Sequence, residues 1–163
     1  MKFTCSTTSL NKAIQTVQRA ISSKPTAPIF SGIHIIAAEN ILYVQAMDLN
    51  MAISCTVESN TEANGEIVVS AKHFSELMRK LPGETVTIIK NKEEKTISVK
   101  SAKSDFQLLL MNEDDYPKFP EFNPEKQIVL EDEKIKELIK KTIFSCSTDE
   151  ARPLFTGILV EIS

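Results

Sequence analysis

The chain has 163 residues, of which 42% are hydrophobic and 25% charged, and its formal net charge is -3. This composition is typical of one globular domain or slightly more, and it excludes disordered and fibrous proteins. No apolar run approaches the ~20 residues of a membrane-spanning helix, and the N-terminus lacks the features of an export signal, so we expect a cytoplasmic protein.

Apolar periodicity predicts helices and strands in alternation along the chain. A stripe at helical spacing behind several hydroxyl residues predicts a helix over residues 7–22, and a second stripe between Ser70 and a Pro-Gly pair predicts one over residues 71–81. A third stripe predicts a helix with Asp132 as its candidate N-cap. Alternating residues predict short strands near residues 2–6, 29–37, 41–47, 51–58, 66–70, 85–90, 95–100 and 105–111.

The predicted order of elements is a repeat. Laying residues 126–163 over residues 1–38 at a constant offset of 125 superimposes the helix stripes and six identical residues without a gap. The identities include Pro153 on Pro28. A weaker echo at an offset of about 64 places Ser70 on Ser6, so each unit is interpreted as two half-units of strand, helix and three strands.

The repeat predicts the domain organisation. Prolines and acidic residues over residues 112–127 are typical of a linker, which separates a complete unit over residues 1–123 from an incomplete one over residues 128–163. The second copy stops after its first strand, helix and strand. Because three elements rarely bury enough surface to be stable alone, we expect a fragment of a longer repeat protein.

Positive charge is concentrated in the predicted helices. Residues 7–24, 70–81 and 133–142 carry +3, +2 and +2, so these 40 residues sum to +7 and the other 123 to -10. Helices packed side by side would present one positive surface that attracts phosphates without reading bases, although exposed helix faces are also commonly rich in lysine. The candidate DNA-contacting residues on these helices are Lys12, Gln15, Arg19, Lys72, Arg79, Lys80, Lys136 and Lys140.

Catalytic and metal-binding patterns are weak. The cysteines Cys5, Cys55 and Cys146 lie far apart, which argues against a disulfide framework and a zinc site and favours small buried side chains. His34 has no partner at an informative spacing, and the acidic run at residues 113–115 is interpreted as linker rather than metal site. We therefore expect no enzyme activity, no metal and no cofactor.

Four segments resemble signature stretches of the bacterial DNA polymerase III β-subunit family, the sliding clamps. They are residues 24–29 (KPTAPI), 47–51 (MDLNM), 115–117 (DYP) and 152–157 (RPLFTG). The resemblance implies an α+β DNA clamp fold of repeated strand-helix-three-strand units. It also implies a homodimeric ring around double-stranded DNA, which tethers the replicative DNA polymerase and works with a clamp loader.

The resemblance assigns further roles to individual residues. It implies that Lys24 touches DNA from a loop and that Lys72 and Arg79 lie on the inner surface. It places Lys103, Phe106 and Leu108 on the edge strand of the dimer interface, and Arg152 and Phe155 on the rim of a peptide pocket. Two alternatives stay open: a β-rich protein-interaction scaffold with no DNA role, and an enzyme that uses Cys146 or His34.

Overall fold

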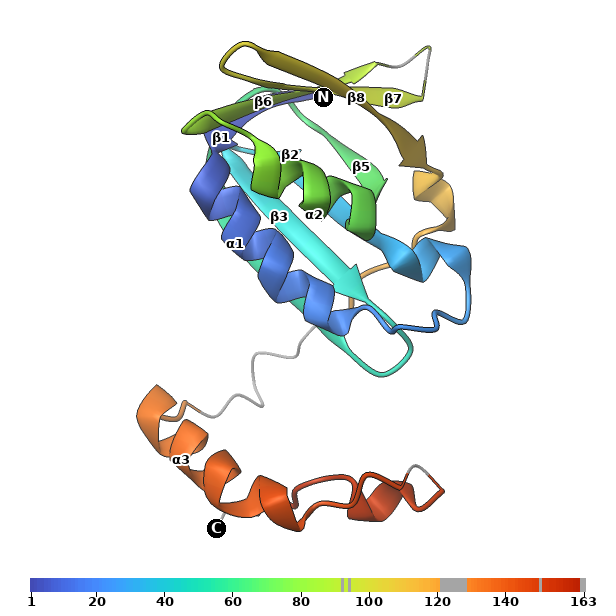
Figure 1. The fold of residues 1–163 in the computed structure, drawn as a ribbon, viewed down its shortest axis with the longest axis vertical. Helices are drawn as coiled ribbons and strands as arrows, with labels where there is room; N and C mark the ends of the chain where they lie inside the picture. Colours follow the sequence, from blue (N-terminus) through green and yellow to red (C-terminus); the bar gives the residue numbers. More distant parts are fainter. Residues whose placement is uncertain (92, 94, 121–128, 150, 162–163) are drawn as a thin grey trace. The chain divides into compact units, whose positions relative to one another are not determined.

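The structure is a computed structural model that describes residues 1–91, 93, 95–120, 129–149 and 151–161 (Figure 1). Contacts divide the chain into two compact units, Met1–Pro120 and Glu121–Ser163, and each is described by itself. None of the helices in the described residues is both long and apolar enough to span a membrane.

The first unit confirms the predicted order of strand, helix and three strands, repeated once. Its helices are α1 (Thr7–Val17) and α2 (Ala71–Lys80), which start 64 residues apart, the predicted offset of the half-units. Its strands are β1 (Lys2–Ser6), β2 (Gly32–Ala38), β3 (Ile41–Met47), β4 (Ala52–Ala63), β5 (Gly65–Ser70), β6 (Thr85–Asn91), β7 (Thr96–Ser101) and β8 (Ser104–Met111).

Three element boundaries differ from the prediction by more than one residue, and one of them is the end of β4, which lies at Ala63 rather than at residue 58. Helix α1 ends at Val17 and continues as a 3-10 turn to Ala20, short of the predicted end at residue 22. Residues 29–31, predicted as the start of a strand, instead form a 3-10 turn that begins at Pro28. Proline has a fixed φ and no N–H to donate, which suits the first position of such a turn and not a strand ladder.

The eight strands of the first unit form a closed barrel in the order β1-β4-β3-β2-β5-β8-β7-β6, and all neighbouring strands are antiparallel. The junction between β5 and β8 is short, because only Val68↔Met111 and Val69↔Leu110 are paired there. Helices α1 and α2 lie side by side across the strands (Figure 1). This arrangement leaves one face of each helix outward.

The core lies between the helices and the inward faces of the strands. Phe3, Ile14, Phe74 and Ile88 are fully buried in one continuous apolar cluster. Cys5 belongs to this cluster, and burial raises the pKa of its thiol to about 12. The expectation of buried cysteines therefore holds for Cys5, whereas Cys55 and Cys146 are partly exposed; all three thiols are free.

The second unit contains α3 (Asp132–Thr142) and two 3-10 turns, Ile143–Ser145 and Pro153–Phe155. Each starts 125 residues after its counterpart in the first unit, which confirms the repeat. The prediction of Asp132 as N-cap is wrong by one position, because Asp132 is the first helical residue and Glu131 is the cap.

The strands predicted in the second unit are not formed in its described residues. Residues 129–131 and 157–161 are outside any strand, although β1 and β2 occupy the matching positions of the first unit. Strand β2 is held between β3 and β5, and the described residues of the second unit provide no such neighbours. The remainder of the predicted strand pair, residues 127–128 and 162–163, lies outside the described residues.

The start of the predicted linker is packed rather than open. Residues Glu113–Asp115 form a 3-10 turn, and Tyr116 after it is only 9% exposed. Residues 113–116, at the start of the predicted linker of residues 112–127, are therefore packed in the first unit, and the linker itself stays a prediction. The proline and acidic residues of this stretch indicate a linker, but its composition contains no information about the contacts of Tyr116.

Candidate nucleic-acid interface

Helix α1 separates its apolar and polar residues as its periodicity predicts. Ser6 caps the helix, and its Oγ accepts a hydrogen bond from the backbone N–H of Ser9 at 3.3 Å. Leu10, Ile14 and Val17 are fully buried, whereas Lys12, Gln15 and Arg19 are exposed. The candidate DNA-contacting side chains of α1 and of the 3-10 turn after it therefore share the outward face.

Helix α2 has the same arrangement. Ala71, Phe74 and Met78 are buried, and the exposed positions include Lys72, Arg79 and Lys80. Arg79 and Lys80 lie in the last turn, where a cation interacts favourably with the negative end of the helix dipole. These basic residues therefore stabilise α2 and also make its outward face positive.

A groove brings the outward faces of α1 and α2 together. Gln15 comes from α1, and Lys72 and Arg79 come from α2, so the structure assembles three of the predicted contact residues in one place. The groove has a volume of about 470 Å³ and its other lining residues are Asn11, Gln18, Ile21, Ser31, Ala71, Ser75 and Glu76. Lys12 on α1, Lys80 on α2 and Arg19 in the 3-10 turn after α1 are exposed but do not line the groove.

One residue that links the two helices at this groove was not predicted from the sequence. Gln18 Nε2 donates a hydrogen bond of 3.1 Å to the backbone oxygen of Ala71, which links the end of α1 to the start of α2. A glutamine at this spacing carries no signal by itself, because its partner lies 53 positions away in the sequence. Asn11 also lines the groove, and its buried Oδ1 accepts no hydrogen bond within the described residues.

The cations of this surface are not neutralised locally. Within the part of the chain that the structure describes, none of Lys12, Arg19, Lys24, Lys72, Arg79 and Lys80 forms an ion pair. Lysines on the strands behave differently: Lys2 pairs with Glu62 at 2.6 Å and Lys100 with Asp105 at 3.3 Å. Ammonium and guanidinium groups outside ion pairs can attract an external anion, and the two cations of the groove outnumber its one carboxylate, Glu76.

The remaining predicted DNA contacts lie elsewhere. Lys24 is exposed in the loop before β2, where its N–H donates to Ser22 Oγ at 3.2 Å. Lys136 and Lys140 are exposed on α3, and Lys136 lies 3.9 Å from Glu133. Since α3 belongs to the second unit, its share in the same surface stays a prediction.

Strand β8 has an open edge over most of its length, although its last two residues pair with β5. Residues Ser104–Leu109 pair with β7 on one side, whereas β5 reaches only Leu110 and Met111 on the other. Phe106 is 42% exposed, and Lys103 is exposed in the turn before the strand. Leu108 is partly buried and packs against the core.

Arg152 and Phe155 lie in one turn of the second unit. The N–H of Phe155 donates to the oxygen of Arg152 at 3.0 Å, and the Phe155 side chain is 62% exposed. The oxygen of Phe155 in turn accepts a 2.8 Å hydrogen bond from the N–H of Ser147. The structure therefore brings the two predicted pocket residues together on the surface of their unit.

The residues of the enzyme alternative serve other contacts. His34 Nε2 lies 2.8 Å from Glu66 Oε2. Cys146 Sγ lies 3.6 Å from the oxygen of Gly157. The described residues contain no cluster of three His, Cys, Asp or Glu side chains that could hold a metal ion.

Comparisons with known proteins agree with this geometry. Residues 1–120 match the family model for the N-terminal domain of the DNA polymerase III beta subunit. The chain is 34% identical over 166 residues to the beta sliding clamp of Bacillus subtilis, covering 97% of this chain and 44% of that protein. It is 28% identical over 163 residues to the beta sliding clamp of Chlamydia muridarum, covering 100% of this chain and 44% of that protein.

Solved structures show the same similarity. The beta subunit from DNA polymerase of Streptococcus pyogenes superposes with a TM-score of 0.89 at 26% identity, covering 96% of this chain and 43% of that one. The DNA polymerase sliding clamp of Bacillus subtilis gives 0.88 at 32% identity, covering 94% and 42%. The chain thus spans less than half the length of the relatives it matches.

Proposed function

The chain belongs to the DNA polymerase III β-subunit family, and we propose that it forms part of a ring-shaped sliding clamp. In this proposal residues 1–120 are the first clamp domain and the residues after them begin the second. The ring encircles double-stranded DNA in the cytoplasm and tethers the replicative DNA polymerase, and a clamp loader places it there. It acts as a processivity factor and makes or breaks no bond itself.

The observation that carries the proposal is the unpaired positive surface of α1 and α2. Lys72 and Arg79 meet Gln15 in one groove and have no ionic partners in the described residues. Flexible cations contact phosphates without regard to base sequence, and each such contact is weak and exchangeable. A protein that must slide needs this kind of contact, because specific base contacts would hold it at one site.

The test compares closed circular with linear duplex DNA of the same sequence. It uses the ring-forming protein that carries residues 1–163, loaded on each DNA and then exposed to rising salt. A topological tether is expected to remain on circles at salt concentrations that abolish phosphate contacts and to escape from linear ends. Equal salt-dependent release from both DNAs would contradict the ring, and no DNA binding at all would favour the β-rich interaction scaffold.

A second prediction concerns the open edge of β8. We propose that Phe106, Leu108 and Lys103 pair with another protomer, since an exposed apolar strand edge is a liability unless it is covered. Phe106→Ala is expected to raise the dimer dissociation constant of the ring-forming protein by about tenfold or more, as for a buried aromatic anchor. Sedimentation measures this constant.

The matched control for the β8 edge is Tyr43→Ala. Tyr43 is 38% exposed, close to the 42% of Phe106, but it lies on β3, which is paired on both sides. Its replacement is expected to leave dimerisation unchanged. Equal effects of the two substitutions would count against β8 as the interface.

A further inference from the structure

The segment Glu113–Tyr116, here called the exit segment, is where the chain leaves the first unit. It follows β8 after one residue, Asn112, and precedes the unit boundary after Pro120. Its composition is acidic and polar, yet it is attached to the strands by two separate contacts. These contacts involve the side chains of Glu113 and Tyr116.

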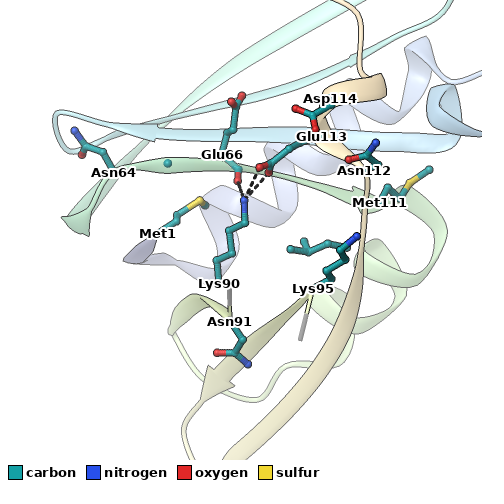
Figure 2. A pocket seen from close by; sticks show the side chains of 12 residues that line it. Met1, Asn64, Glu66, Lys90, Asn91, Lys95, Met111, Asn112, Glu113 and Asp114 are labelled. Carbon is teal, nitrogen blue, oxygen red and sulfur yellow. Dashed lines mark hydrogen bonds and ion pairs between the residues drawn. The ribbon is translucent and has the colours of Figure 1, made fainter. Parts of the chain in front are cut away.

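The first contact is an ion pair between Glu113 and Lys90 at the end of β6. Lys90 Nζ lies 2.8 Å and 2.6 Å from the two carboxylate oxygens of Glu113, and it also donates to the backbone oxygen of Glu66 on β5 at 3.1 Å (Figure 2). The Lys90 side chain is only 19% exposed. One ammonium group therefore joins β6, β5 and the exit segment.

The second contact is made by Tyr116. Its ring lies 5.0 Å from the ring of His34, centroid to centroid, at an interplanar angle of 48°. His34 is in turn held by Glu66 at 2.8 Å. Burial raises the pKa of the Tyr116 phenol to about 12, as expected for a side chain enclosed by the strands.

The first contact lies where strand pairing is weakest. Among the described residues, β8 pairs with Val68 and Val69 of β5 but not with residues 65–67. A cavity of about 630 Å³ opens there, and Lys90 and Glu113 are among its lining residues (Figure 2). Lys90 donates to the Glu66 carbonyl beside this cavity, where the described residues of β8 do not pair with β5.

We infer that Lys90 and Glu113 form a latch that locks the exit segment onto the β5–β8 junction and so fixes where the chain leaves the first unit. Lys90 is suited to this role because it satisfies a β5 carbonyl and a carboxylate at once. Breaking the pair leaves a charge partly buried without its partner, so the exit segment detaches more often. Any effect of the latch on the geometry of the ring rests on the proposed function. The latch itself does not rest on it.

Limited trypsin digestion at Lys118 tests the latch in the 163-residue chain. Lys118 is exposed and lies two residues after Tyr116, so its cleavage reports release of the exit segment. Lys90→Met and Glu113→Gln are each expected to raise the cleavage rate about tenfold, the loss expected for a hydrogen bond to a charged group. The double variant should cleave no faster than Lys90→Met alone, because Lys90→Met already removes the pair with Glu113.

Lys100→Met is the matched control, since it breaks the more exposed pair with Asp105 on neighbouring strands. It should leave cleavage at Lys118 unchanged. Unchanged cleavage in Lys90→Met, or additive effects in the double variant, would overturn the latch. Hydrogen exchange of the β2 and β3 amides identifies global unfolding: a rise there equal to that at residues 113–116 would also overturn it.

The ring-forming protein separates the latch from the proposed function. If the ring forms but the latch is wrong, Phe106→Ala weakens dimerisation while Glu113→Gln leaves cleavage at Lys118 unchanged. If the chain forms no ring, the cleavage result still stands, because it is measured within the first unit.

Discussion

Replacing Lys12, Arg19 and Lys72 together by glutamate is expected to weaken binding of the ring-forming protein to a short linear duplex at least about 100-fold. Each exposed cation attracts phosphate, and its reversal converts that attraction to repulsion. Losing three phosphate contacts should also reduce the slope of log affinity against log salt by about 3. Salt titration of binding to a fluorescent duplex measures both quantities.

The folded state should survive this triple substitution. The three side chains make no ion pairs within the described ranges of the chain, and the apolar stripes beneath them are untouched. Surface changes of this kind usually alter the free energy of unfolding by no more than about 0.5 kcal/mol each. Circular dichroism before and after heating therefore separates lost binding from lost structure.

A matched variant carries the same change of net charge away from α1 and α2. Lys95, Lys100 and Lys118 lie on or beside the strands and the exit segment, and their replacement by glutamate should weaken binding far less. If both triple variants lose DNA equally, binding depends on total charge and the helix surface has no special role.

Periodicity predicted the fold of the first unit because its signals are local. The buried stripe of Leu10, Ile14 and Val17 and the cap at Ser6 lie within twelve residues of each other, and they determine the helix start and its outward face together. The outward positions of Lys12 and Arg19 followed from the same geometry.

Long-range contacts could not be predicted in this way. The hydrogen bond from Gln18 to Ala71 spans 53 residues, and the ion pair from Lys90 to Glu113 spans 23. A polar side chain shows no preference for a distant partner in a single sequence. For this reason the packing of Tyr116 could not be predicted from the composition of the linker. The groove between α1 and α2 was likewise found only in the structure.

The second unit shows which elements local periodicity predicts correctly and which it does not. Helix α3 forms at the expected offset because a helix satisfies its own hydrogen bonds, whereas a strand needs a neighbour. Leu138 and Ile139 are 59% and 42% exposed, so the apolar stripe of α3 is present but uncovered in the described residues. Helices α1 and α3 therefore have the same apolar pattern, but only the stripe of α1 is buried.

This inequality gives the second large prediction, which compares Ile14→Ala with Ile139→Ala. The two isoleucines occupy the same position of the repeat, but Ile14 is fully buried and Ile139 is 42% exposed. Ile14→Ala removes buried methyl groups and leaves a cavity, which costs about 2–5 kcal/mol. Ile139→Ala removes a half-exposed side chain from a helix that favours alanine, so it should cost less than about 0.5 kcal/mol.

Urea unfolding of the 163-residue chain, followed by circular dichroism, measures both costs. The midpoint should fall sharply for Ile14→Ala and stay nearly constant for Ile139→Ala, with similar slopes in both cases. A large loss for Ile139→Ala would mean that α3 is covered by apolar contacts in solution. In that case the second unit would contribute its own core to the stability of the chain, and the repeat would extend from secondary structure to packing.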